Sequence, residues 1–450
     1  MDMLKSIIKW TLLIVLILLA ACTQDNKKLS IEEATYEIVD TLRATDYETV
    51  YEEWFSEDLQ NSISLAQLKN DWEERAHGNG EFLEVHSLKV ENRADNLDIV
   101  EAKVEYTDLL FGIRLIFNEN RILLGFNLSN ALVNLSIPDT IIEEEITVGQ
   151  GTDYELAGLL TLPKDRQDKL PALVLVHGSG PSDRDESAYA YKPFRDIAWG
   201  LAQQGIAVIR YDKRTYVYGE KMLQDNINLT VNEETIEDAI RASEILKNDH
   251  RVDENQVYLA GHSLGGMLAP RIDAQGGDYA GLIILAGTTR SLWEIVYDQN
   301  LYFLDQQTID EKEKQEYLEM IEEEYNKGVE LKEMTLEEAK DISIFGIDAY
   351  YLREMEEYDT SSLIQNLDKP IIVLQGKDDF QVYYEKDFAI YKDLLEDKEK
   401  ARSISYENLN HFFVDYQGQD KGSLKEYDHP GRVSQEVIED IGNWILENQE

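Results

Sequence analysis

The sequence predicts two folded units, a small α+β domain followed by a larger α/β domain with a mostly parallel sheet. From about residue 140 onward, short apolar strand-like runs alternate with helical segments, which is the pattern of a parallel sheet covered on both faces. Before that point, helical segments come first and alternating strands follow them, which favours an antiparallel α+β unit. At 450 residues the chain is also too long for one ordinary domain.

Residues 1–21 have the features of a secretion signal. Two lysines form a charged start, and the apolar core of about ten residues is shorter than the roughly twenty residues of a transmembrane helix. The segment leads into Leu19-Ala20-Ala21-Cys22, which resembles the lipobox of bacterial lipoproteins. This resemblance implies lipidation at Cys22 and anchoring to the outer face of a bacterial cell membrane. Residues 22–30 would form a tether, and the lone cysteine excludes intramolecular disulfides.

Residues 31–132 are expected to form the α+β domain. Helical periodicity extends to about Gly78, and residues 99–106 then alternate apolar and polar side chains as a strand does. Two further runs, residues 112–117 and 121–126, flank a polar turn and predict a hairpin. This order resembles the cone-shaped nuclear transport factor 2-like domains found ahead of some bacterial hydrolases. Such a domain would bind a ligand, cell wall or partner, or space the second domain from the membrane.

Residues 138–450 are expected to form the α/β domain, and its most informative segment is Gly261-His262-Ser263-Leu264-Gly265. An apolar strand-like run precedes this segment, and a helix is predicted to open at Gly266 with Pro270 still in its first turn. A G-x-S-x-G sequence between a strand and a helix builds a sharp turn that exposes the serine hydroxyl. The pattern therefore predicts that Ser263 is a nucleophile.

A serine nucleophile needs a general base, and the base needs an acid that orients it. Of the seven histidines, only His411 and His429 lie well downstream of Ser263. His411 directly follows a strand-like run, whereas His429 lies in a polar turn, so His411 is the predicted base. The acid is expected after the apolar strand of residues 370–376, where Asp379 is favoured over its neighbour Asp378.

The oxyanion of an acyl-transfer intermediate needs two backbone N–H donors. The amide of Leu264 directly follows the nucleophile and supplies the first. The second is expected from the glycine-rich loop that follows the strand-like run of residues 173–176. The amide of Ser179 is the favoured donor there, with Gly178 as the reserve.

Together these motifs resemble the bacterial carboxylesterase branch of the α/β-hydrolase superfamily. Its members carry an H-G-S-G-P-x-D-R-D-E stretch, which reads His177 to Glu186 in this chain, and residues 205–215 and 262–270 are also similar. Members often have Arg-Asp-Tyr-Gln-Val where this chain has Asp378-Asp379-Phe380-Gln381-Val382. This difference leaves open which of the two aspartates is the acid. The resemblance covers roughly residues 140–450. It implies an α/β-hydrolase fold and hydrolysis of short acyl esters without a metal or an organic cofactor.

An acidic helical insertion between residues 287 and 367 is expected to form a cap, at about residues 290–365. Thr335-Leu336-Glu337-Glu338 has the spacing of a capping box, which predicts a helix start. Six aromatic residues of this insertion would either line an acyl pocket or form the cap's own core: Tyr297, Tyr302, Phe303, Phe345, Tyr350 and Tyr351.

The charge of the chain limits its partners. The sequence has 43 Lys and Arg residues and 89 Asp and Glu residues, a net charge of −46. This excludes duplex nucleic acid as a partner, because phosphate binding needs clustered positive charge. The charge also predicts poor capture of anionic esters at low salt.

The leading hypothesis is therefore a membrane-tethered carboxylesterase that acts on a small-molecule ester. A serine peptidase of the aminopeptidase type and a thioesterase use the same fold and the same residues, so fold alone does not separate them. A third reading is a ligand-binding or cell-wall-binding lipoprotein in which residues 30–130 bind and the hydrolase turns over slowly.

Overall fold

The computed structural model describes residues 29–76, 80–93, 96–165, 168–225 and 228–449. The chain divides into two compact units between Asn134 and Leu135. The predicted signal segment and Cys22, the predicted lipidation site, lie outside the described residues. In the described ranges, none of the helices combines the length and the apolar character that crossing a membrane requires.

The first unit packs helices against one antiparallel sheet. Its helices are α2 (Ile31–Arg43), α3 (Tyr47–Thr49), α4 (Glu57–Ser62) and α5 (Leu65–Ala76), and its strands are β1 (Phe82–Asn92), β2 (Asp98–Tyr106), β3 (Leu109–Phe117), β4 (Leu123–Leu128) and β5 (Leu132–Val133). The strand order is β1-β2-β3-β4, and β5 pairs with β3. The apolar alternation in β2 predicted its buried face, since Val100, Ala102 and Val104 all lie in the core.

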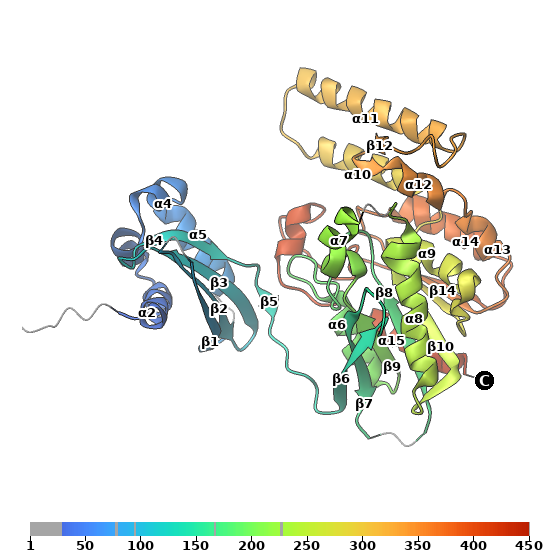
Figure 1. Cartoon of the computed structure of the whole chain (residues 1–450), viewed down its shortest axis with the longest axis horizontal. Helices are drawn as coiled ribbons and strands as arrows, with labels where there is room; N and C mark the ends of the chain where they lie inside the picture. The colour runs from blue at the N-terminus through green and yellow to red at the C-terminus, as the bar shows by residue number, and fades with distance from the viewer. Residues whose placement is uncertain (1–28, 77–79, 94–95, 166–167, 226–227, 450) are drawn as a thin grey trace, which may run out of the picture. The chain divides into compact units, whose positions relative to one another are not determined.

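The second unit is built on an eight-stranded mixed sheet (Figure 1). Its strands are β6 (Ile141–Val148), β7 (Leu156–Pro163), β8 (Leu170–Val176), β9 (Ala207–Tyr211), β10 (Val252–His262), β11 (Leu282–Leu285), β14 (Ile371–Gly376) and β15 (Ala401–Tyr406). The order is β15-β14-β11-β10-β8-β9-β7-β6. The pairs β6–β7 and β7–β9 are antiparallel and the remaining pairs are parallel. The carboxyl ends of the parallel strands therefore meet at one edge, where ligands bind in open α/β sheets.

Helices cover both faces of this sheet (Figure 1). Val174 and Val176 of β8 pack in the core that contains α8 (Glu237–Asn248) and α9 (Leu264–Ile272). Leu173 and Leu175 point to the opposite face, into the core that contains α6 (Pro193–Gln203) and α15 (Gln435–Glu447). Because both faces are buried, β8 reads as a continuous apolar run.

The predicted insertion is present between β11 and β14. It contains α10 (Leu292–Asp305), α11 (Glu311–Leu331), β12 (Ser343–Ile344), β13 (Ile347–Asp348), α12 (Ala349–Met355) and α13 (Thr360–Gln365). Figure 1 shows α10, α11 and α12 beyond the upper ends of α7 (Arg214–Gln224) and α9. The insertion therefore lies on the side of the sheet where β10 ends and α9 begins.

The prediction of a helix start at Thr335 is wrong. The capping bonds themselves form, since the Thr335 amide donates to Glu338 Oε2 at 2.8 Å and the Glu338 amide donates to Thr335 Oγ1 at 3.2 Å. The chain makes only a turn there, and Asp341 then takes a left-handed φ of 62°. A capping box favours a helical first turn, but it does not supply the following apolar face on which most helical stability depends.

Candidate active site

Ser263 stands at the sharp turn between β10 and α9. Its backbone angles are φ 52° and ψ −114°, which few residues other than glycine adopt. The two flanking glycines are required by close backbone contacts. A Cβ on Gly261 would lie 2.1 Å from the Gly265 carbonyl oxygen, and a Cβ on Gly265 would lie 2.3 Å from the Val176 carbonyl oxygen. The local sequence therefore folds into the predicted elbow.

The helix after the elbow begins earlier than predicted. It starts at Leu264 instead of Gly266, which places Pro270 in the second turn and not in the first. The reason is that the turn at Ser263 feeds directly into helical bonding, as the Met267 amide already donates to the Ser263 carbonyl at 3.0 Å. Pro270 has no N–H to donate, so one helical bond is missing at that point.

The structure brings His411 and Asp379 together. His411 Nδ1 lies 2.8 Å from Asp379 Oδ2, and both residues are buried, with 3% and 5% of their surface exposed. Gln375 Nε2 also donates to Oδ2 at 2.8 Å, and the amides of Gln381 and Val382 donate to Oδ1 at 2.8 and 2.9 Å. A carboxylate only accepts hydrogen bonds, so His411 Nδ1 is the protonated nitrogen and Nε2 keeps a lone pair.

The two alternative residues lie elsewhere in the network. Asp378 forms an ion pair with Lys421 at 2.7 Å instead of contacting His411. His429 Nε2 lies 2.9 Å from Asp420 Oδ2, and its ring stacks on Tyr416. Among the described residues, neither side chain is hydrogen-bonded to Asp379 or His411.

His262 connects the elbow to the loop that carries His411. Its Nε2 donates to the His411 carbonyl oxygen at 3.0 Å, and the two rings lie 4.7 Å apart. The glycine-rich loop after β8 approaches from the other side, because a Cβ on Gly178 would lie 3.3 Å from the Ser263 Cβ. His262 thus links the elbow to the His411 loop, and Gly178 lies beside Ser263, which is half-buried.

The two predicted oxyanion donors, Leu264 and Ser179, lie on either side of the elbow, at the start of α9 and in the loop after β8. The amide of Leu264 is the first of α9, and the first amides of a helix have no acceptor within it. The Gly178 amide donates to Glu186 Oε1 at 2.7 Å, so it is already engaged. The reserve candidate Gly178 is therefore disfavoured, and the amide of Ser179 stays the predicted donor.

The charged residues of the H-G-S-G-P-S-D-R-D-E stretch hold this loop against β9. Arg184 pairs with Asp212 at 2.8 Å, and Asp185 pairs with Arg210 at 3.0 Å. Asp185 also accepts from Lys192 at 2.7 Å. These ion pairs explain why a loop that carries a backbone donor is so rich in charge.

Burial and nearby charge shift the pKa values of His177 and His262 in opposite directions. Burial lowers the pKa of His177 to about 4. Burial also opposes charge on His262, but the Glu186 carboxylate, whose Oε2 lies 3.0 Å from His262 Nδ1, raises the pKa of His262 above its usual 6.5. Burial likewise opposes charge on Glu186, and His262 keeps the pKa of this carboxyl below its usual 4.5. Sequence reasoning did not identify this pair, because its members are 76 residues apart.

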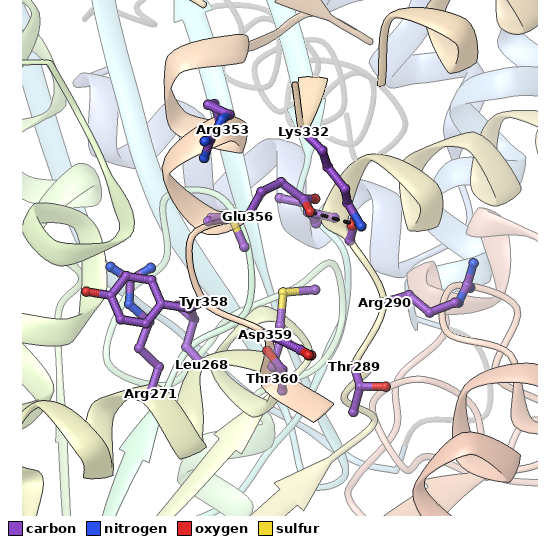
Figure 2. A pocket seen from close by; sticks show the side chains of 14 residues that line it. Leu268, Arg271, Thr289, Arg290, Lys332, Arg353, Glu356, Tyr358, Asp359 and Thr360 are labelled. Carbon is purple, nitrogen blue, oxygen red and sulfur yellow. Dashed lines mark ion pairs between the residues drawn. The ribbon is translucent and has the colours of Figure 1, made fainter. Parts of the chain in front are cut away.

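A cavity of about 300 Å³ lies between α9 and the segment that joins α12 to α13 (Figure 2). Met267 and Leu268, one turn after Ser263, form part of its wall. Its cationic side chains are balanced by carboxylates, as the ion pair of Lys332 with Glu356 at 3.3 Å illustrates. The guanidinium of Arg271 lies 3.6 Å from the ring centre of Tyr358.

The aromatic residues predicted for the insertion divide between two surroundings. Tyr297 packs on Tyr325 of α11, and Phe303 and Phe345 line a cavity of about 450 Å³ beside α11. Tyr302 instead stacks on Phe380, the residue next to Asp379. The insertion therefore contributes aromatic surface both to its own core and to the neighbourhood of the site.

The fold and the arrangement around Ser263 define a hydrolase, and the chain belongs to the alpha/beta hydrolase family, which matches residues 173–417. Esterase EstD of Thermotoga maritima is 37% identical over 309 residues, which are 69% of this chain and 68% of that protein. The family match also confirms the predicted fold class. Residues 36–126 match a family of unknown function, DUF3887. The likeness of this unit to nuclear transport factor 2 stays a prediction.

Solved structures of esterases are also similar to this chain. Est1E from Butyrivibrio proteoclasticus is 16% identical with a TM-score of 0.43, over 68% of this chain and 98% of that one. An esterase from Pyrococcus furiosus is 12% identical with a TM-score of 0.43, over 71% of this chain and 96% of that one. Among the described residues, no three His, Cys, Asp or Glu side chains gather as metal ligands would.

Proposed function

We propose that this protein is a membrane-anchored carboxylesterase that cleaves short acyl esters through a serine acyl-enzyme. Ser263 Oγ attacks the ester carbonyl while His411 Nε2 accepts its proton. Asp379 holds the imidazole by its Nδ1–H, and the amides of Leu264 and Ser179 stabilise the oxyanion. His411 then gives the proton to the leaving alcohol, and a water molecule that His411 deprotonates releases the acid.

The observation that carries this proposal is the 2.8 Å contact between His411 Nδ1 and Asp379 Oδ2, which His262 links to the serine on a strained elbow. A base that is oriented by a buried carboxylate and leaves Nε2 available is what a serine nucleophile needs. The family match and the 37% identical esterase support ester hydrolysis as the reaction class.

Ester, thioester and amide substrates with the same acyl group test the choice of bond. We expect p-nitrophenyl butyrate and the matching thioester to be hydrolysed, and the p-nitroanilide to react at least 10²-fold more slowly. Amides react more slowly than esters, because the amine is a poor leaving group that must be protonated as the C–N bond breaks. Comparable rates for the anilide and the ester would favour the peptidase alternative, and a thioester rate far above the ester rate would favour the thioesterase alternative.

We further propose that Cys22 carries the lipid anchor and that the enzyme faces the outside of the cell membrane. The lipobox resemblance of residues 19–22 supports this part of the proposal. Two or more acyl chains give stable anchoring, whereas one chain binds a membrane only marginally. We expect Cys22→Ala to move the protein out of the membrane fraction, and a variant that stays there entirely would contradict lipidation.

A binding role for the first unit is the remaining alternative. A hollow of about 380 Å³ lies on its sheet, and Lys89, Lys103 and Arg114 are among the residues that line it. Such cations stand out in a chain with a net charge of −46. This alternative would move ahead of the esterase proposal if residues 30–130 alone bound cell-wall material as fully as the whole protein does, and if the whole protein showed negligible ester turnover.

A further inference from the structure

Two buried, oppositely charged side chains hold Gly178, whose carbonyl belongs to the peptide of the predicted second oxyanion donor, Ser179. Lys213 Nζ donates to the Gly178 carbonyl oxygen at 2.7 Å, and Glu186 Oε1 accepts from the Gly178 amide at 2.7 Å. Only 2% of Lys213 and 5% of Glu186 is exposed. Gly178 is thus held at both its N–H and its C=O.

The geometry of a peptide bond links Lys213 to the oxyanion. The Gly178 C=O and the Ser179 N–H belong to the same planar peptide unit, and in a trans peptide they point in opposite directions. A side chain that fixes the direction of the carbonyl therefore fixes the direction of the Ser179 N–H. A cation on the carbonyl oxygen also polarises the peptide, which strengthens its N–H as a donor.

The Lys213 ammonium is itself fixed by a second partner. It forms an ion pair with Glu234 at 2.5 Å, and the other oxygen of Glu234 accepts from the Tyr351 hydroxyl at 2.7 Å. Tyr351 belongs to α12 of the insertion. Lys213 follows β9, so the ammonium lies between the glycine-rich loop and the side chains that hold Glu234.

Stability alone is a weak reason for this arrangement. Taking two charges out of water costs several kcal/mol per ion, and well-packed apolar residues often replace a buried ion pair without loss. An ammonium that points at a carbonyl oxygen has, in contrast, a specific effect on the peptide that it contacts.

We propose that Lys213 is a positioning residue for the oxyanion hole, which it orients and polarises through the Gly178–Ser179 peptide. The inference rests on the proposed acyl-enzyme mechanism and deepens it. Because the Lys213 ammonium is buried against Gly178 and Glu234, its contribution is expected in the transition state and not in substrate binding.

The test compares Lys213→Met with the wild-type enzyme on p-nitrophenyl butyrate. We expect kcat to fall about 10- to 100-fold, approaching the 10²–10³-fold cost of losing one oxyanion donor, while KM changes less than about 3-fold. Affinity for butylboronic acid, which forms a tetrahedral adduct on serine, should weaken by a similar factor. Lys221→Met is the matched control, because Lys221 also donates to a backbone carbonyl, that of Asp153, but lies at the surface.

A double variant separates positioning from charge balance. Lys213→Met leaves the buried Glu234 carboxylate without its cationic partner, which is strongly destabilising and threatens folding. The variant Lys213→Met with Glu234→Gln removes both charges, so we expect it to fold but to keep the loss in kcat. Recovery of wild-type kcat in this double variant would overturn the inference and assign Lys213 to neutralising Glu234.

Failure of the inference differs from failure of the proposed function. The inference alone would be overturned if the wild-type enzyme were fully active on the ester and a folded Lys213 variant kept the same kcat and the same boronic acid affinity. Wild-type protein without ester hydrolysis would overturn the proposed function and this inference with it.

Discussion

At the scale of single residues, Ser263 combines a strained backbone with a hydroxyl at the edge of the sheet. A positive φ in a non-glycine residue costs of order 1–3 kcal/mol, and such residues persist where the surrounding structure holds them. The bond from the Ser263 amide to the Leu285 carbonyl, at 2.8 Å, helps to hold it. This turn places the Ser263 side chain next to the glycine-rich loop, while the neighbouring His262 contacts the His411 loop.

The choice between the two adjacent aspartates leads to a prediction. Asp379→Asn should lower kcat by about 10⁴-fold, because an amide in this place favours the wrong imidazole tautomer. Asp378→Asn is the matched control, since Asp378 pairs with Lys421 instead of His411. We expect its kcat within about 2-fold of wild type in the same p-nitrophenyl ester assay. Equal losses in both variants would contradict the assignment.

The buried pair of Glu186 and His262 leads to a prediction about pH. Because the folded pKa of His262 is raised, its contribution to stability is present below pH 6.5 and is lost as pH rises through the folded pKa. The unfolding free energy of wild type should therefore exceed that of His262→Gln most at about pH 6, and the difference should shrink toward pH 9.

Urea unfolding from pH 6 to 9 measures this difference. His250→Gln serves as the control, because the His250 side chain is 92% exposed and its replacement should change stability equally little at each pH. Glu186 acts in the other direction. Because its folded pKa is lowered, the contribution of its carboxylate to stability is present above pH 4.5 and is lost as pH falls through the folded pKa. A difference for His262→Gln that grows above pH 6.5 would rule out the charged pair.

At the scale of elements, the elbow depends on a close approach between α9 and β8. Gly265→Ala should destabilise the protein by about 3 kcal/mol or more, because its Cβ would meet the Val176 carbonyl oxygen at 2.3 Å. Gly219→Ala in α7 should instead stabilise it by about 0.5–1 kcal/mol, since a Cβ there has nothing within 4 Å. Thermal and urea unfolding measure both changes, and a Gly265→Ala protein as stable as wild type would refute the close approach.

Elements differed in how well the sequence predicted them. Strand β8 was recognisable because it is buried on both faces and is therefore apolar throughout. Strand β2 was recognisable because its apolar and polar side chains alternate. Strand β1 was missed, because most of its residues are exposed or half-buried and give no clear period. The turn at Thr335 was misread as a helix, since local capping chemistry says nothing about tertiary packing.

The site was predictable in part for a similar reason. The order of nucleophile, acid and base along the chain, together with their places after strands, pointed to Asp379 and His411, which the structure joins at 2.8 Å. Lys213 and Glu186 were not recognised as parts of the site. Their function depends on which buried carbonyl and amide they contact, and neither spacing nor composition encodes that contact.

At the scale of the whole molecule, the net charge of −46 should oppose anionic substrates. At low ionic strength we expect kcat/KM for a neutral ester to exceed that of a matched anionic ester by about tenfold. Raising the salt concentration to about 0.5 M should narrow the gap, because the screening length falls below 10 Å. Measuring both esters across a salt series checks this, and a ratio that is independent of salt would show that steering by overall charge is absent.

The most direct test of the central claim is covalent labelling of Ser263 together with an assay of ester hydrolysis. A fluorophosphonate should add one label to wild type at Ser263 and abolish p-nitrophenyl butyrate hydrolysis. Ser263→Ala should lose about 10⁴-fold or more in kcat and take up no label, while Ser62→Ala, an exposed control in the first unit, should match wild type. A folded Ser263→Ala protein that keeps its activity, or wild type labelled at another residue, would contradict the account.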